Sequence, residues 1–349
     1  MSENKKKYLE IFYLISFFFF SFLFAFQSFN EMPKYDHAIE SEILYDYWFE
    51  NEFQWGEEIV QNIGPYGWIH FPKTFTGFLD LENILMHIFL TIISIFIFFE
   101  FSKHFNEKQK IIYQFIFVFV QSQNIVLFFD PVIYNNHLAS VSIYESTNYV
   151  IFFLAFINMI NEKSIFKLLI YIFFTSLYAL GKGVFLIQFL FFLPLVLFLR
   201  SKKFPLKDNI LIFLLFLLNL SIMWIVANQD PKNFFNFIIS SFNFSSGYQY
   251  TLHGHKFFMD LATVSIFLIL IIVSLTKSIR EILKDLQIKI FSYHFCYFLM
   301  EGLFIFAVFK HSVICSRPYH ASIMFWVFLL IIYPFIFLNF GGNKVKSYS

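Results

Sequence analysis

The sequence predicts an all-α polytopic membrane protein, a single integral membrane domain over residues 1–349 with about ten transmembrane helices. Composition is the first reason, because 58% of the residues are hydrophobic and 14% are charged, whereas soluble domains carry roughly 25% charged residues. The second reason is a series of apolar runs near the roughly 17–25 residues that a helix needs to cross the hydrocarbon core. The third is one long polar segment, residues 30–82, which we expect to be a structured outer loop.

Ten apolar runs approach or reach this length. In chain order they are residues 9–29, 83–101, 111–129, 142–160, 164–180, 184–199, 209–227, 258–276, 290–309 and 320–340. The first is too long for a signal-peptide core and lacks a cleavage site, so we expect a retained anchor. The fourth is weak because Ser142, Glu145 and Asn148 interrupt its first half, and the sixth is short. Only Gly181-Lys182-Gly183 separates the fifth from the sixth, which predicts a tight helical hairpin.

The distribution of positive charge predicts the orientation of these spans. Ten spans put both termini on one side of the membrane, and the connections on that side hold 18 of the 25 Lys and Arg residues. The seven on the opposite side are Lys34, Lys73, Lys182, Lys232, Lys256, Lys310 and Arg317. The positive-inside rule therefore places both termini in the cytoplasm. The loops with the most varied polar residues then lie outside, where we expect the protein to act.

Several classes of function are excluded by what the chain lacks. A net charge of +1 and the absence of a basic patch with interleaved aromatics argue against a nucleic-acid partner. No phosphate-binding P-loop or GxGxxG motif suggests a cytosolic nucleotide. Cys296 and Cys315 lack metal-ligand spacing, so we expect both to be packing residues.

The outer loop supplies the first candidate catalytic residues. It contains the turn signal Gly64-Pro65-Tyr66-Gly67, whose Tyr66 we place in a substrate-binding loop. Asp36 follows the first span, and a carboxylate walled by aromatics near the bilayer could have a raised pKa and act as a general base. Glu40 lies one helical turn further on and could share that site. The alternative for Asp36 is an ordinary solvated loop acid.

A second long outer loop, residues 228–257, contains the substrate-loop candidates Tyr248, His253 and His255. Two histidines one glycine apart suggest a divalent metal, but no third ligand is evident, and so no metal or other cofactor is assigned. Contacts with the membrane interface or with lipid phosphates are the alternative. The apolar stretch from Phe234 to Phe244 is suited to lying in the interface.

Cations on the outer side run against the positive-inside trend. Lys310, Arg317 and His320 lie around the connection between the last two spans, where they could bind a phosphate, with Arg317 offering a bidentate fork. Lys182 is another isolated outer cation, and its flanking glycines would let a ligand approach the backbone. The alternative is that these residues anchor the helices at the interface. Glu301, inside the ninth span, is a further functional candidate because a carboxylate is costly in lipid.

Taken together, short motifs along most of the chain resemble a group of poorly characterised bacterial multi-span proteins that are similar to the GT-C glycosyltransferases. The motifs are Tyr35-Asp36-His37, Trp55-Gly56-Glu57, Gly64-Pro65-Tyr66-Gly67-Trp68, Ala179-Leu180-Gly181-Lys182-Gly183, Trp224, Gln229, Ser245-Ser246-Gly247-Tyr248, Lys310 and Arg317 to His320.

This resemblance implies a GT-C-like fold in a bacterial cytoplasmic (inner) membrane and transfer of a sugar from a polyprenyl-phosphate carrier at the outer face. The partners would be a lipid-linked sugar donor, a glycan or lipid acceptor and membrane lipids. Asp36 would act as base or orient the acceptor, and Lys182, Lys310 and Arg317 would hold the donor phosphate. Two alternatives remain open. One is a transporter or flippase for a lipid-linked or anionic solute, for which Glu301 and Asp260 are candidate coupling acids. The other is a non-catalytic protein of envelope assembly.

Overall fold

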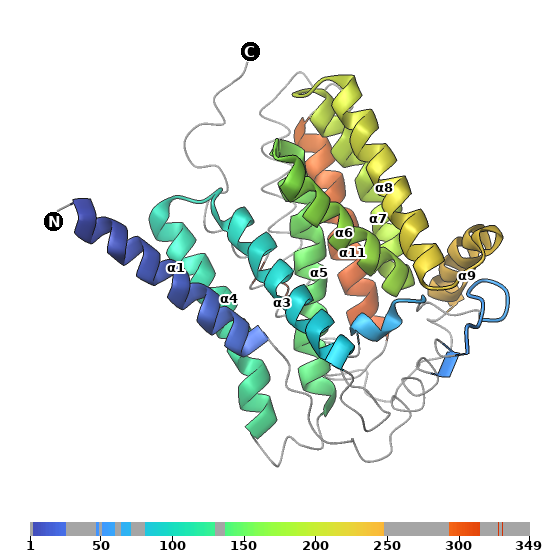
Figure 1. The fold of residues 1–349 in the computed structure, drawn as a ribbon, viewed down its shortest axis with the longest axis horizontal. Coiled ribbons are helices and arrows are strands. Elements are labelled where there is room, and N and C mark those ends of the chain that lie inside the picture. Colours follow the sequence, from blue (N-terminus) through green and yellow to red (C-terminus); the bar gives the residue numbers. More distant parts are fainter. Residues whose placement is uncertain are drawn as a thin grey trace.

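The computed structural model describes residues 3–25, 47–48, 51–59, 64–70, 81–129, 137–247, 293–314, 327 and 330. This part of the chain is mostly helical and contains no β-strand (Figure 1). The helices are α1 (Glu3–Ala25), α3 (Leu81–Ser102), α4 (Glu107–Phe129), α5 (His137–Asn161), α6 (Ile165–Gly181), α7 (Gly183–Ser201), α8 (Leu206–Val226), α9 (Phe234–Gly247) and α11 (Tyr293–Ile314). Short 3-10 turns, η1 (Gly67–His70) and η3 (Pro231–Asn233), complete the list.

The long helices coincide with runs of Phe, Ile and Leu in the sequence. Three described stretches are long and apolar enough to cross a membrane: Leu85–Ser102, Gly183–Ser201 and Leu206–Val226. Shorter apolar stretches are Glu10–Leu23, Ser146–Asn161 and Ile165–Gly181. These findings are those of an all-α membrane protein. The predicted spans 258–276 and 320–340 lie outside the described residues, apart from Val327 and Leu330.

Helix α5 forms the centre of the bundle. It packs against α3, α4, α6 and α7, and all of its residues from 146 to 160 are buried (Figure 1). Aromatic rings fill the contacts: Phe152 lies 4.9 Å from Phe185, and Phe153 stacks 4.5 Å from Phe304. Because protein rather than lipid surrounds this helix, polar side chains such as Asn148 are tolerated in its first half. That setting explains why the fourth span looked weak in the sequence.

Helices α1 and α4 form a pair at the edge of this bundle. In Figure 1 they lie side by side and apart from α6, α7 and α8, and α1 also touches α3. A polar chain joins them, because the Tyr13 hydroxyl donates to Gln114, whose amide donates to Ser102 Oγ at 2.8 Å. Phe12 and Ile15 of α1 remain largely exposed, as expected for side chains that face lipid.

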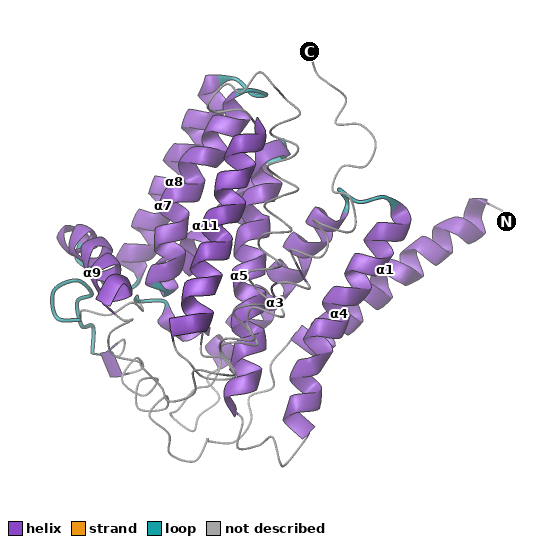
Figure 2. Ribbon diagram, turned by 180° about the vertical axis from the view of Figure 1, so that it is seen from behind, coloured by secondary structure: helices purple, strands orange, loops and turns teal. Residues whose placement is uncertain are grey.

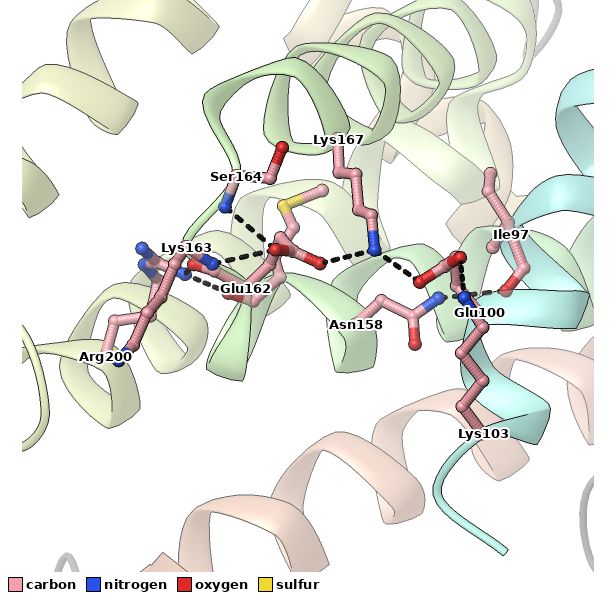
Figure 3. A network of polar contacts seen from close by, with 10 residues as sticks. Ile97, Glu100, Lys103, Asn158, Glu162, Lys163, Ser164, Lys167 and Arg200 are labelled. Atoms are coloured by element: carbon pink, nitrogen blue, oxygen red, sulfur yellow. Dashed lines mark hydrogen bonds and ion pairs between the residues drawn. The ribbon is translucent and has the colours of Figure 1, made fainter. Parts of the chain in front are cut away.

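One end of the bundle carries a charged network, which we call the Glu162 end (Figure 3). Lys167 Nζ of α6 lies 2.6 Å from Glu100 Oε2 of α3 and 3.5 Å from Glu162 Oε2, just past α5. The buried Arg200 of α7 donates from Nη1 to the backbone carbonyls of Met159 and Glu162. Four helix ends are thereby tied by ion pairs and by hydrogen bonds to backbone carbonyls.

Candidate functional site

The opposite end of the bundle is organised by the hairpin between α6 and α7, and we call it the Lys182 end. Lys182 is the one residue between the two helices, with extended backbone angles of φ −151° and ψ 133°. Its N–H donates to the Tyr178 carbonyl at 3.1 Å, and its own carbonyl accepts from the Phe185 N–H at 2.9 Å. The side chain is only 7% exposed. The break between the helices therefore places a buried lysine at this end.

The turn at residues 64–67 of the first loop docks directly onto this hairpin. The N–H of Gly64 donates to the Gly181 carbonyl at 3.0 Å, and that of Tyr66 donates to the Leu180 carbonyl at 3.4 Å. A Cβ at Gly64 would lie 2.2 Å from the Leu180 oxygen, so a larger residue cannot make this approach without a backbone shift. The Tyr66 hydroxyl donates to the Met223 carbonyl of α8 at 2.7 Å, and burial raises the pKa of Tyr66 to about 12.

Buried polar groups of α5 and α6 lie near the same hairpin. Tyr178, one turn before Lys182, donates through its hydroxyl to Asn148 Oδ1 at 2.8 Å. Asn148 is 2% exposed, and its Nδ2 has no hydrogen-bond partner in the described structure. The ring of Phe185 contacts both Tyr149 and Tyr178, with centroids 4.7 and 5.5 Å away. An amide donor is thus buried close to the lysine, an arrangement that is unfavourable unless an acceptor meets it.

Lys310 approaches this end from α11, which packs against α7. Cys296, near the start of α11, lies within electrostatic reach of Lys202 at the other end of α7. Lys310 is 14 residues further on, about 21 Å along the helix, and therefore lies toward the Lys182 end.

Helices α7 and α11 carry two further buried polar residues. Glu301 of α11 is 9% exposed, and Gln188 of α7 is 3% exposed. Neither amide atom of Gln188 has a hydrogen-bond partner within the described part of the chain.

A separate open cleft lies beside the Lys182 end, between residues 52–57 of the first loop and residues 225–233, which comprise the end of α8 and the segment that follows it. It has a volume of about 550 Å³. Figures 1 and 2 both show the adjoining helix α9 beside the end of α8. We call it the loop cleft, and its lining residues are Glu52, Gln54, Glu57, Ile225, Asn228, Gln229, Asp230, Lys232 and Asn233. Hydrogen bonds from Lys232, first from its backbone N–H, hold the pKa of Asp230 below its ordinary value.

The structure brings together some of the residues that the sequence singled out. Tyr66 bonds to the hairpin that holds Lys182, and the length of α11 indicates that Lys310 lies toward the same end of the bundle. The remaining candidates lie outside the described residues, and their placement is not tested: Asp36, Glu40, Tyr248, His253, His255, Arg317 and His320. Within the described ranges no group of three or more His, Cys, Asp or Glu residues could hold a metal ion.

Sequence reasoning missed the loop cleft and the pairing of Tyr178 with Asn148. Trp55-Gly56-Glu57 and Gln229 were noticed as separate motifs, but nothing local indicates that the Trp55 N–H meets Gln229 Oε1 at 2.8 Å. In the sequence, Asn148 only weakens the apolar pattern of its span. A polar residue inside an otherwise apolar helix was the signal available, because in membranes such residues face the protein interior.

The chain was compared with protein families, curated proteins and solved structures. No family model, no curated protein and no solved structure matches the chain.

Proposed function

We propose that the chain is a GT-C-like glycosyltransferase of the bacterial cytoplasmic membrane, with about ten transmembrane helices and its Lys182 end outside. It would transfer a sugar from a polyprenyl-phosphate carrier to a glycan or lipid acceptor. The observation that carries the proposal is Lys182 itself, a lysine buried at a helix break, roofed by the turn at residues 64–67 and close to buried polar side chains. A cation held there suits a lipid-linked phosphate that enters between helices.

The chemistry follows from the charges that we assign to this end. Asp36, assisted by Glu40, would take the proton of the acceptor hydroxyl, whose oxygen then bonds to the anomeric carbon of the donor sugar. The bond from that carbon to the phosphate oxygen breaks, and the polyprenyl phosphate leaves with the electron pair. Lys182 and Lys310, with Arg317 and His320, would stabilise the negative charge that develops on the leaving phosphate.

The test is sugar transfer by the full chain in lipid nanodiscs, supplied with polyprenyl-phosphate sugars and an acceptor lipid fraction. We expect Lys182→Met to lower the transfer rate by about 100-fold, because removing one preorganised charge-stabilising group has an effect of that order. Lys182→Arg should restore part of it. The matched control is Lys202→Met, which removes an exposed lysine near the Glu162 end and should leave transfer unchanged.

The role of the base is tested in the same assay by Asp36→Asn. We expect a loss of about 100-fold or more, since a positioned general base contributes about that much. Unchanged transfer by both Lys182→Met and Asp36→Asn, with unaltered melting temperatures, would rule out the assigned mechanism.

A second candidate, a transporter or flippase, is favoured by Glu301 and Gln188. Both are buried in helices that pack together, Glu301 inside α11 and Gln188 in the second turn of α7, and intramembrane polar groups often mark solute pathways. Proteoliposomes separate the two functions. Movement of a lipid-linked or anionic solute that depends on Glu301 and needs no acceptor would favour transport, whereas acceptor-dependent transfer that survives Glu301→Gln favours the enzyme.

A further inference from the structure

The loop cleft is built by two segments that lie far apart in the sequence and bond to each other reciprocally. Gln54 donates through Nε2 to the Asn228 carbonyl at 2.9 Å and accepts at Oε1 from the Asp230 N–H at 2.8 Å. Gln229 accepts from the Trp55 N–H at 2.8 Å and donates to the Phe53 carbonyl at 3.1 Å. These bonds hold the cleft walls at a set distance, so the space between them is a property of the fold.

Backbone geometry supports a cleft maintained for use. Glu52 and Asn228 both have φ of 55°, and they are the non-glycine residues with positive φ in the described part of the chain. They lie against each other, because Asn228 Nδ2 donates to Glu52 Oε1 at 3.0 Å. Gly56 has φ of 89°, and a Cβ there would lie 2.5 Å from the Phe237 nitrogen. At Asn228 this conformation ends α8, because the N–H groups of Asn228 and Gln229 bond to the carbonyls of Ile225 and Trp224. At Glu52 an unfavourable backbone conformation persists because the surroundings impose it.

The charge of the cleft decides which ligands it can accept. Three carboxylates line it, those of Glu52, Glu57 and Asp230, against one ammonium, that of Lys232. Because the balance is negative, a phosphate or another anion is disfavoured there. The cleft is therefore chemically unlike the cationic site proposed around Lys182.

Unused hydrogen-bonding capacity in the lining favours a hydroxyl-rich ligand. Glu52 uses Oε1 for Asn228, and Glu57 uses Oε2 for Asn233 at 2.9 Å, so each can accept a further bond through its other oxygen. Amides and carboxylates together are the groups that bond to sugar hydroxyls. The volume of about 550 Å³ is that of a small-ligand site, and the open side would let a longer chain pass.

We propose that the loop cleft binds a neutral or cationic saccharide, apart from the phosphate-binding residues. Only the further identification of this saccharide as the acceptor glycan rests on the proposed function. The saccharide lies between the two loop segments, with its hydroxyls bonded to Glu52, Glu57 and Asp230. Binding requires no lipid-linked donor.

The test uses the full chain in nanodiscs without donor, with saturation-transfer difference NMR on maltotriose, chitotriose and the glucosamine trimer. We expect saturation of at least one saccharide, and an affinity about tenfold weaker in Glu52→Gln/Glu57→Gln, because charge-assisted bonds become neutral ones. Glutamine can still accept from Asn228 and Asn233, so the cleft should keep its shape, which the melting temperature checks. The matched control is Glu58→Gln, an exposed acid of the same loop outside the lining, which should stay within about twofold of the native chain.

Three outcomes would overturn the proposal. They are saturation of none of the saccharides, equal affinity in the double variant and the native chain, and binding of Ca²⁺ in calorimetry with no saccharide bound. The variant Lys182→Met distinguishes an error in the cleft proposal from an error in the proposed function. It is expected to lose transfer while it binds saccharide as the native chain does, and transfer without saccharide binding would contradict the cleft alone.

Discussion

At the scale of single residues, Tyr66 links the first loop to the helix bundle through hydrogen bonds. Its hydroxyl reaches the Met223 carbonyl of α8, while its N–H bonds to the end of α6. Burial disfavours the phenolate, which is why the pKa of Tyr66 rises to about 12. The phenol therefore stays protonated and donating throughout the physiological range.

This raised pKa makes stability depend on alkaline pH. The group is protonated in both states below its unfolded pKa of about 10, so its contribution is complete there and is lost as the pH rises toward 12. We expect the free energy of unfolding to fall over this range by an extra amount on the order of 2 kcal/mol relative to Tyr66→Phe. Denaturant unfolding of the native chain and Tyr66→Phe at several pH values measures this difference. If the unfolding free energies of the two proteins fall in parallel between pH 10 and 12, the prediction is wrong.

At the scale of elements, the contact between the turn at residues 64–67 and the hairpin is the tightest link from loop to bundle. Gly64→Ala places a Cβ 2.2 Å from the Leu180 oxygen. Overpacking of this kind costs about 1–3 kcal/mol, and we expect the loop to detach before the bundle unfolds. Hydrogen exchange of residues 64–70 should accelerate. Gly302→Ala is the matched control, since a Cβ there meets nothing within 4 Å, and equal exchange in both variants would contradict the docking.

The charged network at the Glu162 end is a second element-scale link. Lys167 is the bridge between Glu100 and Glu162, and the side chain of Glu100 is only 10% exposed. We expect Lys167→Met to lower the free energy of unfolding by about 1–3 kcal/mol, because it leaves a largely buried carboxylate with less compensation. Lys110→Met removes a pair with Glu107, which is 85% exposed, and should change stability by less than about 0.5 kcal/mol. Thermal or denaturant melts measure both variants. An equal loss of unfolding free energy in Lys167→Met and Lys110→Met would show that the Lys167 bridge does not stabilise the fold.

At the scale of the whole molecule, the two ends differ in kind. The Glu162 end is tied by Lys, Arg and Glu side chains (Figure 3). The Lys182 end carries the hairpin between α6 and α7, with the loop cleft beside it. We predict that the Glu162 end faces the cytoplasm, following the positive-inside rule.

Cysteine labelling tests this orientation. In a background without Cys296 and Cys315, Glu58→Cys should react with a membrane-impermeant maleimide added outside intact cells, and Lys163→Cys should react only after lysis. Both positions are exposed, so burial does not decide the result. Reaction of Lys163→Cys from outside would invert the predicted topology and remove the outer-face site from the proposal.

Much of the architecture could be predicted from local sequence. In the described part of the chain a helix overlaps eight of the ten predicted apolar ranges, and the other two ranges lie almost wholly outside that part. The hairpin at Gly181-Lys182-Gly183 is present with a single intervening residue. Local patterns suffice for this because length, apolarity and glycine placement act within one turn or one span. The candidate site was harder to predict from the sequence, because Tyr66, Lys182 and Asn148 belong to three segments that meet only when the helices pack.

By itself, the sequence determined where the helices form and which chain segments are too polar to lie in lipid, because hydrophobicity and backbone propensity are properties of neighbouring residues. The tertiary structure alone decided that α5 is central and that Lys182 is buried. It also decided that Gln54 and Gln229 join two distant segments beside the loop cleft. Those outcomes depend on side-chain packing and on hydrogen bonds such as the one between Gln54 and Asp230, which lie 176 positions apart, and no local pattern encodes which distant partner satisfies a given polar group.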